Sequence, residues 1–475
     1  MADKAQIVKP RTLSGFMELL PSEQIVFNKI KSVLTKVYEL HGFYPLDTPV
    51  IEASEVLLAK GGGETEKQIF NIDSSDHDMS MRFDLTVPLA KYVAKNYSSL
   101  SFPFRRYQIG KVYRGERPQR GRFREFYQSD IDIIGDTALG ILNDAEIPSI
   151  IYQIFNELGI DDFTIRINNR KVLGGFFALI GYEDKIEDIL RVVDKVEKIG
   201  KEAEMEELAK LGLTAKASEK LWNFISLTAN IEGQSMLSNA EVISKLREIA
   251  ESEKASSGAD ASAFEEGIKE LEIVINAISS FGVPEGYYKI DLSIARGLDY
   301  YTGTVYETML KKHPEIGSIC SGGRYENLAG YYINRKLPGV GISIGLTRLF
   351  YILSEKKYVK SDVTAPASVL VIPMTDDFAG KTMKYAESLN AYFINEGIAS
   401  QIYLEEKKFK AKMNYASSLK IPYVAIIGDD EEMEGTVALK NFETGEQVNV
   451  SKEQAANIVE KALDIKESDK IVNMQ

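Results

Sequence analysis

The chain is poor in the side chains that cross-link proteins or bind metals. Among its 475 residues are one cysteine, Cys320, and three histidines, His41, His77 and His313. A single cysteine excludes an internal disulfide framework, and so few histidines leave no Cys/His cluster of the kind that holds zinc. We therefore expect neither disulfides nor a structural metal.

Long hydrophobic runs are also absent. No apolar stretch approaches the roughly 18–20 residues that span a bilayer, and the first residues lack the apolar core of a secretory signal. We expect a cytoplasmic protein with no membrane partner. Hydrophobic residues make up 44% and charged residues 27% of the chain, as in folded soluble proteins. At roughly 100–200 residues per domain, the length suggests two to four domains.

The chain carries no overall positive charge. Its formal net charge is −13, opposite in sign to a basic nucleic-acid-binding module. Basic residues are nevertheless dense between positions 105 and 124, where seven arginines and one lysine stand against Glu116 alone. Guanidinium groups form rigid forks that suit phosphate oxygens, whereas a surface strand pair that serves solubility mixes both signs. The cluster therefore favours phosphate binding.

The first clear element is a helix. Apolar residues at helical spacing predict it over residues 22–41, with Ser22 as its N-cap and Gly42 as its stop. Residues 43–51 follow, and the two prolines in this segment push the residues before them toward extended backbone.

Two strand-like runs between residues 104 and 135 flank the arginine-rich turn. Period-2 alternation places a polar row with one aromatic ring on one face of the second run, namely Arg124, Phe126, Gln128, Asp130 and Asp132. Such a row is typical of the floor of a site, although a solvated sheet face has the same pattern.

The second half of the chain changes character twice. Residues 183–285 carry alternating charges at helical spacing and predict a helical insertion, with a low-complexity loop over 251–263. A predicted linker at 362–366 precedes a segment in which strands and helices alternate. Strands at 368–373, 399–404 and 423–428 alternate with helices near 377–396 and 407–419, before a hairpin around 441–447 and a helix from Ser451. This rhythm predicts a small, mostly parallel, doubly wound domain.

Three further segments carry polar or glycine-rich patterns. Residues 296–301 join an arginine, a glycine and paired tyrosines, which suits a binding site but also a strand–turn–strand with core tyrosines. Residues 322–325 by themselves read as a turn. Residues 339–349 read as a buried strand, a glycine turn and a helix start. Arg348 then lies in the first helical turn, where it opposes the macrodipole unless an anion is nearby; an exposed cation is the alternative.

Common nucleotide-binding motifs are missing. The chain has no Gly-x-x-x-x-Gly-Lys-[Ser/Thr], and residues 339–345 miss Gly-x-Gly-x-x-Gly by one position. Asp84, Gln128 and Asp132 nevertheless lie among arginines. Carboxylates can hold a small zwitterion with an amine or imidazole while arginines hold phosphates, which fits amino-acid activation by ATP.

The order of these segments resembles the histidyl-tRNA synthetases, a family of class II aminoacyl-tRNA synthetases. The helix and extended stretch that end at Pro49 resemble class II motif 1, residues 113–132 resemble motif 2, and residues 341–349 resemble motif 3. Residues 296–301 and 322–325 resemble the two histidine-specific signatures. The resemblance runs from about residue 12 to residue 465.

This resemblance implies an α+β catalytic domain, built on an antiparallel sheet from residues 1–182 and 286–360. The helical insertion at 183–285 interrupts it, and an α/β anticodon-binding-like domain follows at 366–475. The insertion is either a lid over the tRNA acceptor stem or surface decoration, and its residues do not decide between them. Motif 1 builds a dimer interface in this class, so a homodimer is expected.

The resemblance also implies roles toward ATP, which would bring Mg²⁺ with it. Arg114 would hold the α-phosphate and stabilise the pentavalent transition state, and Glu116 would read the adenine amino group. Arg348 would bind the γ-phosphate and, with Phe126, sandwich the adenine. Arg296 would lie on the α-phosphate opposite Arg114, where other class II enzymes use a metal.

Toward histidine, the resemblance implies two groups of residues. Asp84, Thr86 and Gln128 would hold the α-ammonium. Asp132 and Tyr301 would bracket the imidazole, Arg296 would also face the amino acid, and the pocket would be shaped by Tyr300 and Tyr325. Many members have Glu where this chain has Asp132, so its reach to the imidazole is shorter. Arg117 and Gln119 would meet the acceptor end of the tRNA.

The implied activity is ATP-dependent activation of L-histidine and its transfer to tRNA(His), giving histidyl-tRNA, AMP and pyrophosphate. No residue stands out as the general base for the transfer, and a substrate phosphate could serve. One alternative is a catalytically silent, histidine-sensing regulatory paralogue, which typically lacks the C-terminal domain and the motif arginines. A purely RNA-binding module is the other alternative, and it would not need the 296–301 signature.

Overall fold

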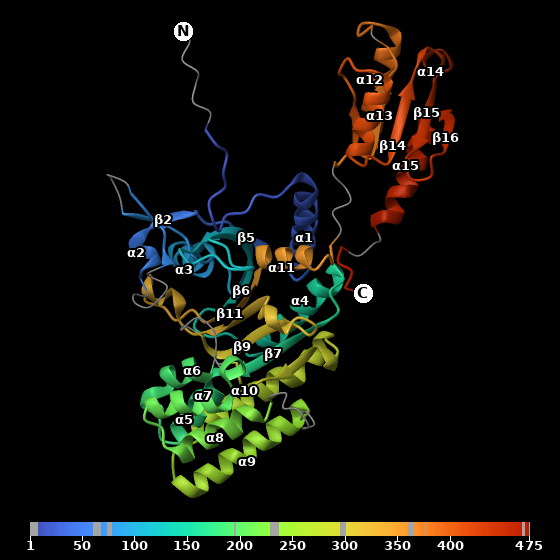
Figure 1. The fold of residues 1–475 in the computed structure, drawn as a ribbon. Coiled ribbons are helices and arrows are strands. Elements are labelled where there is room, and N and C mark those ends of the chain that lie inside the picture. Colours follow the sequence, from blue (N-terminus) through green and yellow to red (C-terminus); the bar gives the residue numbers. More distant parts are fainter. Residues whose placement is uncertain are drawn as a thin grey trace. The chain divides into compact units, whose positions relative to one another are not determined.

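The computed structural model describes residues 8–59, 68–73, 78–193, 196–228, 237–294, 301–359, 365–375, 377–467 and 471–474. Internal contacts divide the chain into a larger unit that includes residues 33–356 and a smaller unit that includes residues 18–32 and 357–473. Each unit has its own sheet (Figure 1). Among the described residues, no helix is both long enough and apolar enough to cross a bilayer.

The larger unit is built on a broad sheet. In spatial order its strands are Tyr44–Pro45 (β1), Phe104–Tyr113 (β5), Glu125–Ile134 (β6), Gly339–Gly345 (β11), Cys320–Tyr325 (β10), Tyr301–Leu310 (β9), Phe163–Asn169 (β7) and Tyr288–Ile290 (β8). The pairs from β5 to β7 are antiparallel, and the edge pairs β1–β5 and β7–β8 are parallel. The expected antiparallel-sheet catalytic fold is confirmed. Residues 322–325 lie within strand β10, which corrects their interpretation as a turn.

The two faces of this sheet have opposite character. Ile131 and Ile133 of β6 are fully buried on one face. Helix α4, Leu142–Leu158, packs on that side, and the Tyr306 hydroxyl of β9 donates a hydrogen bond of 2.8 Å to the backbone oxygen of Asp144 in α4. The alternation predicted for the second strand therefore leaves its polar row on the other face.

The larger unit also contains the helices Ser54–Leu57 (α2), Thr86–Asn96 (α3) and Leu346–Glu355 (α11), and a small sheet of Ile51–Ala53 (β2), Met79–Met81 (β4) and Asn71–Ile72 (β3). The helix Pro21–Leu40 (α1) contributes residues 33–40 to this unit, and its first part is grouped with the smaller unit. The predicted N-cap of the first helix is wrong. Helix α1 begins at Pro21, so Ser22 lies inside the helix and does not cap it. The Glu23 carboxylate accepts a hydrogen bond from the Leu20 amide at 2.8 Å near this end.

A group of helices lies beside β7 and β9 in Figure 1. They are Arg170–Leu179 (α5), Ile186–Val193 (α6), Val196–Lys210 (α7), Ala215–Ser226 (α8), Asn239–Ser257 (α9) and Ser262–Ile278 (α10). Helix α10 packs closely on α5, because a Cβ atom on Gly175 would lie 2.5 Å from the Phe264 backbone. Stacked rings of Phe176 and Phe224, 4.0 Å apart, join α8 to the same core.

The loop predicted over 251–263 is mostly helix. Helix α9 starts at a capping box in which Ser238 and Glu241 bond each other's backbone amides, and it runs on to Ser257. Gly258 then ends it in the left-handed conformation, so only residues 258–261 separate α9 from α10. The low complexity of this segment reflects exposed helix surface rather than a long connection.

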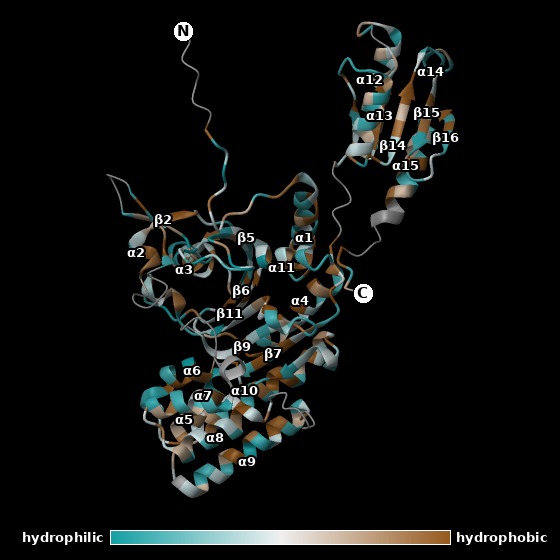
Figure 2. Ribbon diagram, in the orientation of Figure 1, coloured by the Kyte–Doolittle hydropathy of each residue, from teal (hydrophilic) through white to brown (hydrophobic). Residues whose placement is uncertain are grey.

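The smaller unit has a sheet covered on both faces. Its strands are, in order, Ser400–Ile402 (β13), Val369–Pro373 (β12), Tyr423–Ile427 (β14), Thr436–Asn441 (β15) and Gln447–Ser451 (β16). Helices Lys381–Asn395 (α12) and Lys452–Glu467 (α15) pack on one face and Phe409–Ser418 (α13) on the other. The short helix Asp429–Glu434 (α14) precedes β15. Figure 2 shows the hydrophobic strand β14 between more polar helices.

The sequence predicted a mostly parallel sheet, but the sheet of the smaller unit is mixed. The pairs β13–β12 and β12–β14 are parallel, but β14–β15 and β15–β16 are antiparallel, because the predicted hairpin joins the same sheet. The α/β class and the helices on both faces are as expected.

Candidate active site

The polar face of the larger sheet is hollowed into a cavity of about 490 Å³. Its walls come from β6, β9, β10, β11, the start of α3, the β5–β6 loop and α11. It brings together ten of the residues predicted for the site, from widely separated parts of the chain: Asp84, Thr86, Arg114, Glu116, Phe126, Gln128, Asp132, Tyr301, Tyr325 and Arg348.

Two predicted residues with described positions, Arg117 and Gln119, are not among those that line the cavity. Arg117 and Gln119 lie in the β5–β6 loop, where Gln119 and Arg122 exchange backbone hydrogen bonds of 3.2 and 2.8 Å. Arg296 and Tyr300 lie outside the described residues.

One end of the cavity is acidic, and its Asp132 carboxylate is held in place by two neighbouring side chains. Arg106 Nη2 lies 2.5 Å from Asp132 Oδ2, and the Tyr325 hydroxyl donates to Asp132 Oδ1 at 3.0 Å. Burial raises the pKa of Asp132, and the Arg106 charge opposes that rise. Gly341 makes room for the carboxylate, since a Cβ atom there would lie 2.4 Å from Asp132 Oδ1.

Asp84 and Gln128 present unpaired acceptors at the same end. Asp84 Oδ1 accepts a hydrogen bond from the Val87 amide at 3.0 Å, and burial raises the pKa of Asp84 to about 6 against the pull of that bond and of Arg114. The Gln128 amide donates through Nε2 to Ser343 Oγ at 2.6 Å. Within the described residues, the buried Asp84 Oδ2 and Gln128 Oε1 have no hydrogen-bond partner. Such acceptors suit a small cation that donates several hydrogen bonds.

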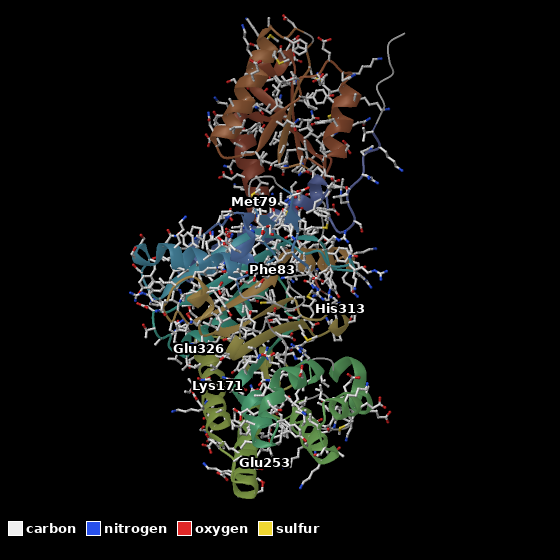
Figure 3. All side chains as sticks on the ribbon, turned by 90° about the vertical axis from the view of Figure 1, so that its left-hand side faces the viewer. Met79, Phe83, Lys171, Glu253, His313 and Glu326 are labelled. Carbon is white, nitrogen blue, oxygen red and sulfur yellow. The ribbon has the colours of Figure 1, made fainter. Side chains whose placement is uncertain are left out.

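The other end of the cavity is basic. Arg114 Nε donates to the Phe83 backbone oxygen at 3.0 Å, and its guanidinium carbon lies 5.1 Å from the centre of the Phe126 ring. Phe83 is labelled in Figure 3, in the larger unit. Glu116 lies 3.9 Å from both Arg114 and Arg122. Arginines around one carboxylate leave a positive surface for an anion of several charges.

Arg348 joins this basic end from the first turn of α11, as the sequence predicted. Its guanidinium donates to the backbone oxygen of Ile316, which aims the side chain along the cavity wall. Gly121 of the β5–β6 loop approaches it, since a Cβ atom there would lie 3.7 Å from Arg348 Cγ.

The cavity lining also includes residues that were not singled out for the site, among them Asp130, Ser343 and Arg122. Asp130 belongs to the polar row on β6, so the alternation pointed to it. Ser343 is brought opposite Asp130 by the β6–β11 register, which no local pattern reveals. The described residues contain no group of three or more His, Cys, Asp or Glu side chains placed to hold a metal ion.

The arrangement can therefore hold an ammonium group at one end and a polyphosphate at the other. A family model for histidyl-tRNA synthetase matches residues 15–349. The chain belongs to the histidyl-tRNA synthetase family. A second model, for an anticodon-binding domain, matches residues 368–462.

Individual relatives agree with this assignment. The chain is 56% identical to the histidine–tRNA ligase of Clostridium tetani over 97% of its own length and 100% of the relative's. It is 47% identical to that of Finegoldia magna, with 93% and 97% of the two chains covered. The crystal structure of histidyl-tRNA synthetase from Nostoc sp. PCC 7120 matches with a TM-score of 0.86 at 38% identity, covering 96% and 100%.

These findings favour the ligase over the regulatory paralogue. Such paralogues typically lack the C-terminal domain, which in this chain is present and matched. Arg114 and Arg348 also both line the cavity.

Proposed function

We propose that this protein activates L-histidine with ATP and transfers it to tRNA(His), as a histidine–tRNA ligase. The observation that carries the proposal is the two-ended cavity, with buried unpaired acceptors at one end and arginines around Phe126 at the other. A histidine α-ammonium fits the first end, and the phosphates and adenine of ATP fit the second.

In the first step, the histidine carboxylate attacks the α-phosphorus of ATP. The bond from that phosphorus to the bridging oxygen breaks, so histidyl-adenylate forms and pyrophosphate leaves. Arg114 and Arg296 stabilise the negative charge that builds on the α-phosphate, while Arg348 holds the γ-phosphate. Glu116 reads the adenine amino group, and Phe126 stacks on the ring. The protein supplies position and charge and needs no nucleophile of its own.

The amino acid is held by the acidic end. Asp84, Thr86 and Gln128 receive the α-ammonium. Asp132 and Tyr301 bracket the imidazole, with Tyr300 and Tyr325 closing the pocket around it.

In the second step, a ribose hydroxyl of the terminal adenosine of tRNA attacks the histidyl carbonyl, and AMP leaves with its phosphate. The hydroxyl proton goes to a substrate phosphate, because no residue of the sequence stands out as the general base for this step. Arg117 and Gln119 meet the acceptor end, and the C-terminal domain reads the anticodon. The segment 183–285 is proposed as a separate helical insertion beside this site.

The remaining partners are proposed on the same basis. Mg²⁺ enters with ATP and neutralises part of its phosphate charge. The functional assembly is a homodimer formed through the motif 1 segment, and light scattering that gives a stable monomer would exclude it. Because ATP and tRNA are the substrates, we place the activity in the cytoplasm.

The proposal is tested by charging tRNA(His) transcript with labelled histidine. We expect acid-precipitable label that requires ATP and tRNA, and we expect Arg114→Ala to abolish it. Arg335→Ala is the matched control, because Arg335 packs on the Tyr97 ring away from the cavity lining and should leave charging intact. Charging by Arg114→Ala at the wild-type rate would contradict the proposed site.

The two steps can be separated. Arg117→Ala and Gln119→Ala should keep histidine-dependent pyrophosphate exchange and lose tRNA charging, because both residues lie outside the cavity lining. Equal loss of both activities would place these residues in the first step instead.

A further inference from the structure

A turn near the N-terminus, residues 13–16, lies against the β5–β6 loop, and both belong to the larger unit. A backbone hydrogen bond of 3.1 Å between its first and last residues closes the turn, and its third residue, Gly15, has a φ of +88°. A positive φ at the third position of a tight turn favours glycine. The Gly15 carbonyl accepts hydrogen bonds from two successive amides, Arg124 at 2.7 Å and Glu125 at 3.3 Å.

These two amides lie where β6 extends past its neighbour β11. Strand β11 ends at Gly345, opposite Gln128, so it does not reach the first residues of β6. The Tyr127 amide instead donates to a side-chain hydroxyl of α11 at 2.8 Å. The Gly15 carbonyl serves in the same way two residues earlier, at Glu125. It therefore fixes the start of β6, where strand amides would otherwise lack a protein partner.

Arg124 connects this contact to two residues of the cavity. Its backbone oxygen accepts a hydrogen bond from the Arg114 amide at 2.9 Å, and its Nε donates to the Glu116 backbone oxygen at 3.0 Å. Arg114 and Glu116 both line the basic end of the cavity. A series of hydrogen bonds thus runs from the N-terminal turn to the residues proposed to bind the α-phosphate and the adenine.

The packing at Gly15 is as close as the hydrogen bonding. A Cβ atom there would lie 2.9 Å from Arg124 Cγ and 3.0 Å from Pro118 Cγ. Neither atom is the far end of a flexible side chain, so a side chain at position 15 would push the loop away. Glycine is therefore needed both for its φ and for the space that the loop occupies.

We propose that Gly15 is a positioning residue for ATP and acts through Arg124 on Arg114 and Glu116. The N-terminal turn holds the β5–β6 loop in the form in which these two residues meet the α-phosphate and the adenine. The inference rests on the proposed activation of histidine by ATP, and it adds a distant segment of the chain to the ATP site. Histidine is proposed to lie at the acidic end, which other residues build, so the turn acts on one of the two small substrates.

The test compares Gly15→Ala with Gly282→Ala by ATP–pyrophosphate exchange. Gly282 has the same φ of +88°, but a Cβ atom there would meet nothing within 4 Å. Both variants strain the backbone alike, and only Gly15→Ala displaces the loop. For Gly15→Ala we expect the KM for ATP to rise about tenfold, the effect of one misplaced hydrogen bond to a charged group, with the KM for histidine unchanged. Gly282→Ala should leave both KM values unchanged.

Three results of this comparison would overturn the proposal. The first is an unchanged KM for ATP in Gly15→Ala. The second is an equal rise in both KM values, which a merely structural role would produce. The third is an equal rise in the KM for ATP in Gly15→Ala and Gly282→Ala, because backbone strain would then account for the effect.

Arg124→Met tests the connection itself and leaves the turn intact, so it applies even if Gly15→Ala does not fold. It keeps the stem beside Gly15 and removes the Nε that donates to Glu116. We expect a raised KM for ATP and an unchanged KM for histidine. Arg120→Met is the control for charge, because Arg120 lies in the same loop but is 68% exposed and pairs with Glu355. Unchanged KM values in Arg124→Met, or an equal effect of Arg120→Met, would overturn the route through Arg124.

Trypsin gives a readout that needs no catalysis. Cleavage after Arg120 and Arg122 reports how firmly the β5–β6 loop is held. Without ATP, Gly15→Ala should be cut there faster than wild type, as followed by mass spectrometry, and Gly282→Ala should not. Cleavage of Gly15→Ala at the wild-type rate would overturn the proposed contact. Wild-type protein without exchange would refute the proposed function instead, whatever the cleavage rates, so the two failures are distinguishable.

Discussion

Arg106 and Asp132 form an ion pair beneath the cavity that is almost completely removed from water. Their side chains are 0% and 5% exposed, and Arg106 Nη2 lies 2.5 Å from Asp132 Oδ2. Asp132 comes from the polar row on β6, and Arg106 is its direct partner on β5. The residue proposed to bind imidazole is thus oriented by a charge behind it.

Breaking this pair should lower the free energy of unfolding. Arg106→Met leaves Asp132 as an uncompensated buried charge, and we expect a loss of about 3–5 kcal/mol in urea denaturation. The double variant Arg106→Met/Asp132→Asn should recover part of this loss, because the unpaired charge is the main penalty. A double variant less stable than Arg106→Met alone would contradict this reading.

The Phe126 ring should matter for ATP and not for histidine. Phe126→Ala should raise the KM for ATP about tenfold, since stacking of a base on an aromatic ring contributes about 1–3 kcal/mol. Phe126→Tyr keeps the ring and serves as the control. The KM values are measured by steady-state exchange kinetics. A changed KM for histidine with an unchanged KM for ATP would contradict the proposal that Phe126 binds ATP.

Arg324 should support the fold rather than the chemistry. It donates to Asp144 through Nε and Nη2 and to the backbone oxygens of Leu139 and Gly140, with Asp144 fully buried. Arg324→Ala should lower the free energy of unfolding by about 3–5 kcal/mol, leaving the KM values unchanged.

The exposed pair Arg191–Asp188 is the control for that measurement. Its atoms lie 2.8 Å apart, but both side chains are more than half exposed. Arg191→Ala should change the free energy of unfolding by less than about 1 kcal/mol. If Arg324→Ala changed the free energy of unfolding by an equally small amount, burial would not strengthen the Arg324–Asp144 pair.

His41 gives the fold a pH dependence that can be measured directly. The Glu146 carboxylate, whose Oε1 lies 3.7 Å from His41 Nδ1, raises the pKa of His41 above its usual 6.5, and Gln153 adds to the rise. The stabilisation is fully present below pH 6.5 and is lost as pH rises through the higher pKa of the folded state. NMR titration of the few histidines should show the raised midpoint, and Glu146→Gln should lower it. An unchanged midpoint in that variant would contradict the assignment to Glu146.

Local patterns predicted those parts of the site that one strand or helix carries. Period-2 alternation put Phe126, Gln128 and Asp132 on one face, and helical spacing put Arg348 in a first turn. Both outcomes follow from local backbone geometry. The order of the motifs along the whole chain also predicted the fold of the catalytic domain. The family model and the related crystal structure confirm that fold.

Contacts between distant segments could not be predicted in this way. Ser343 meets Asp130 only through strand register, and Arg324 finds Asp144 across 180 residues of chain. Composition also misled: the segment 251–263 is low in complexity, yet a capping box and a left-handed glycine make most of it helical. Register and capping depend on tertiary context, which a single sequence shows only in part.

The most direct measurement of the central claim is histidine-dependent exchange of labelled pyrophosphate into ATP, for wild type, Arg114→Ala and Arg296→Ala. The account predicts strong exchange with histidine alone among the amino acids, and its loss in both variants. An intact wild-type protein that binds histidine without exchange would contradict the account and indicate a silent sensor.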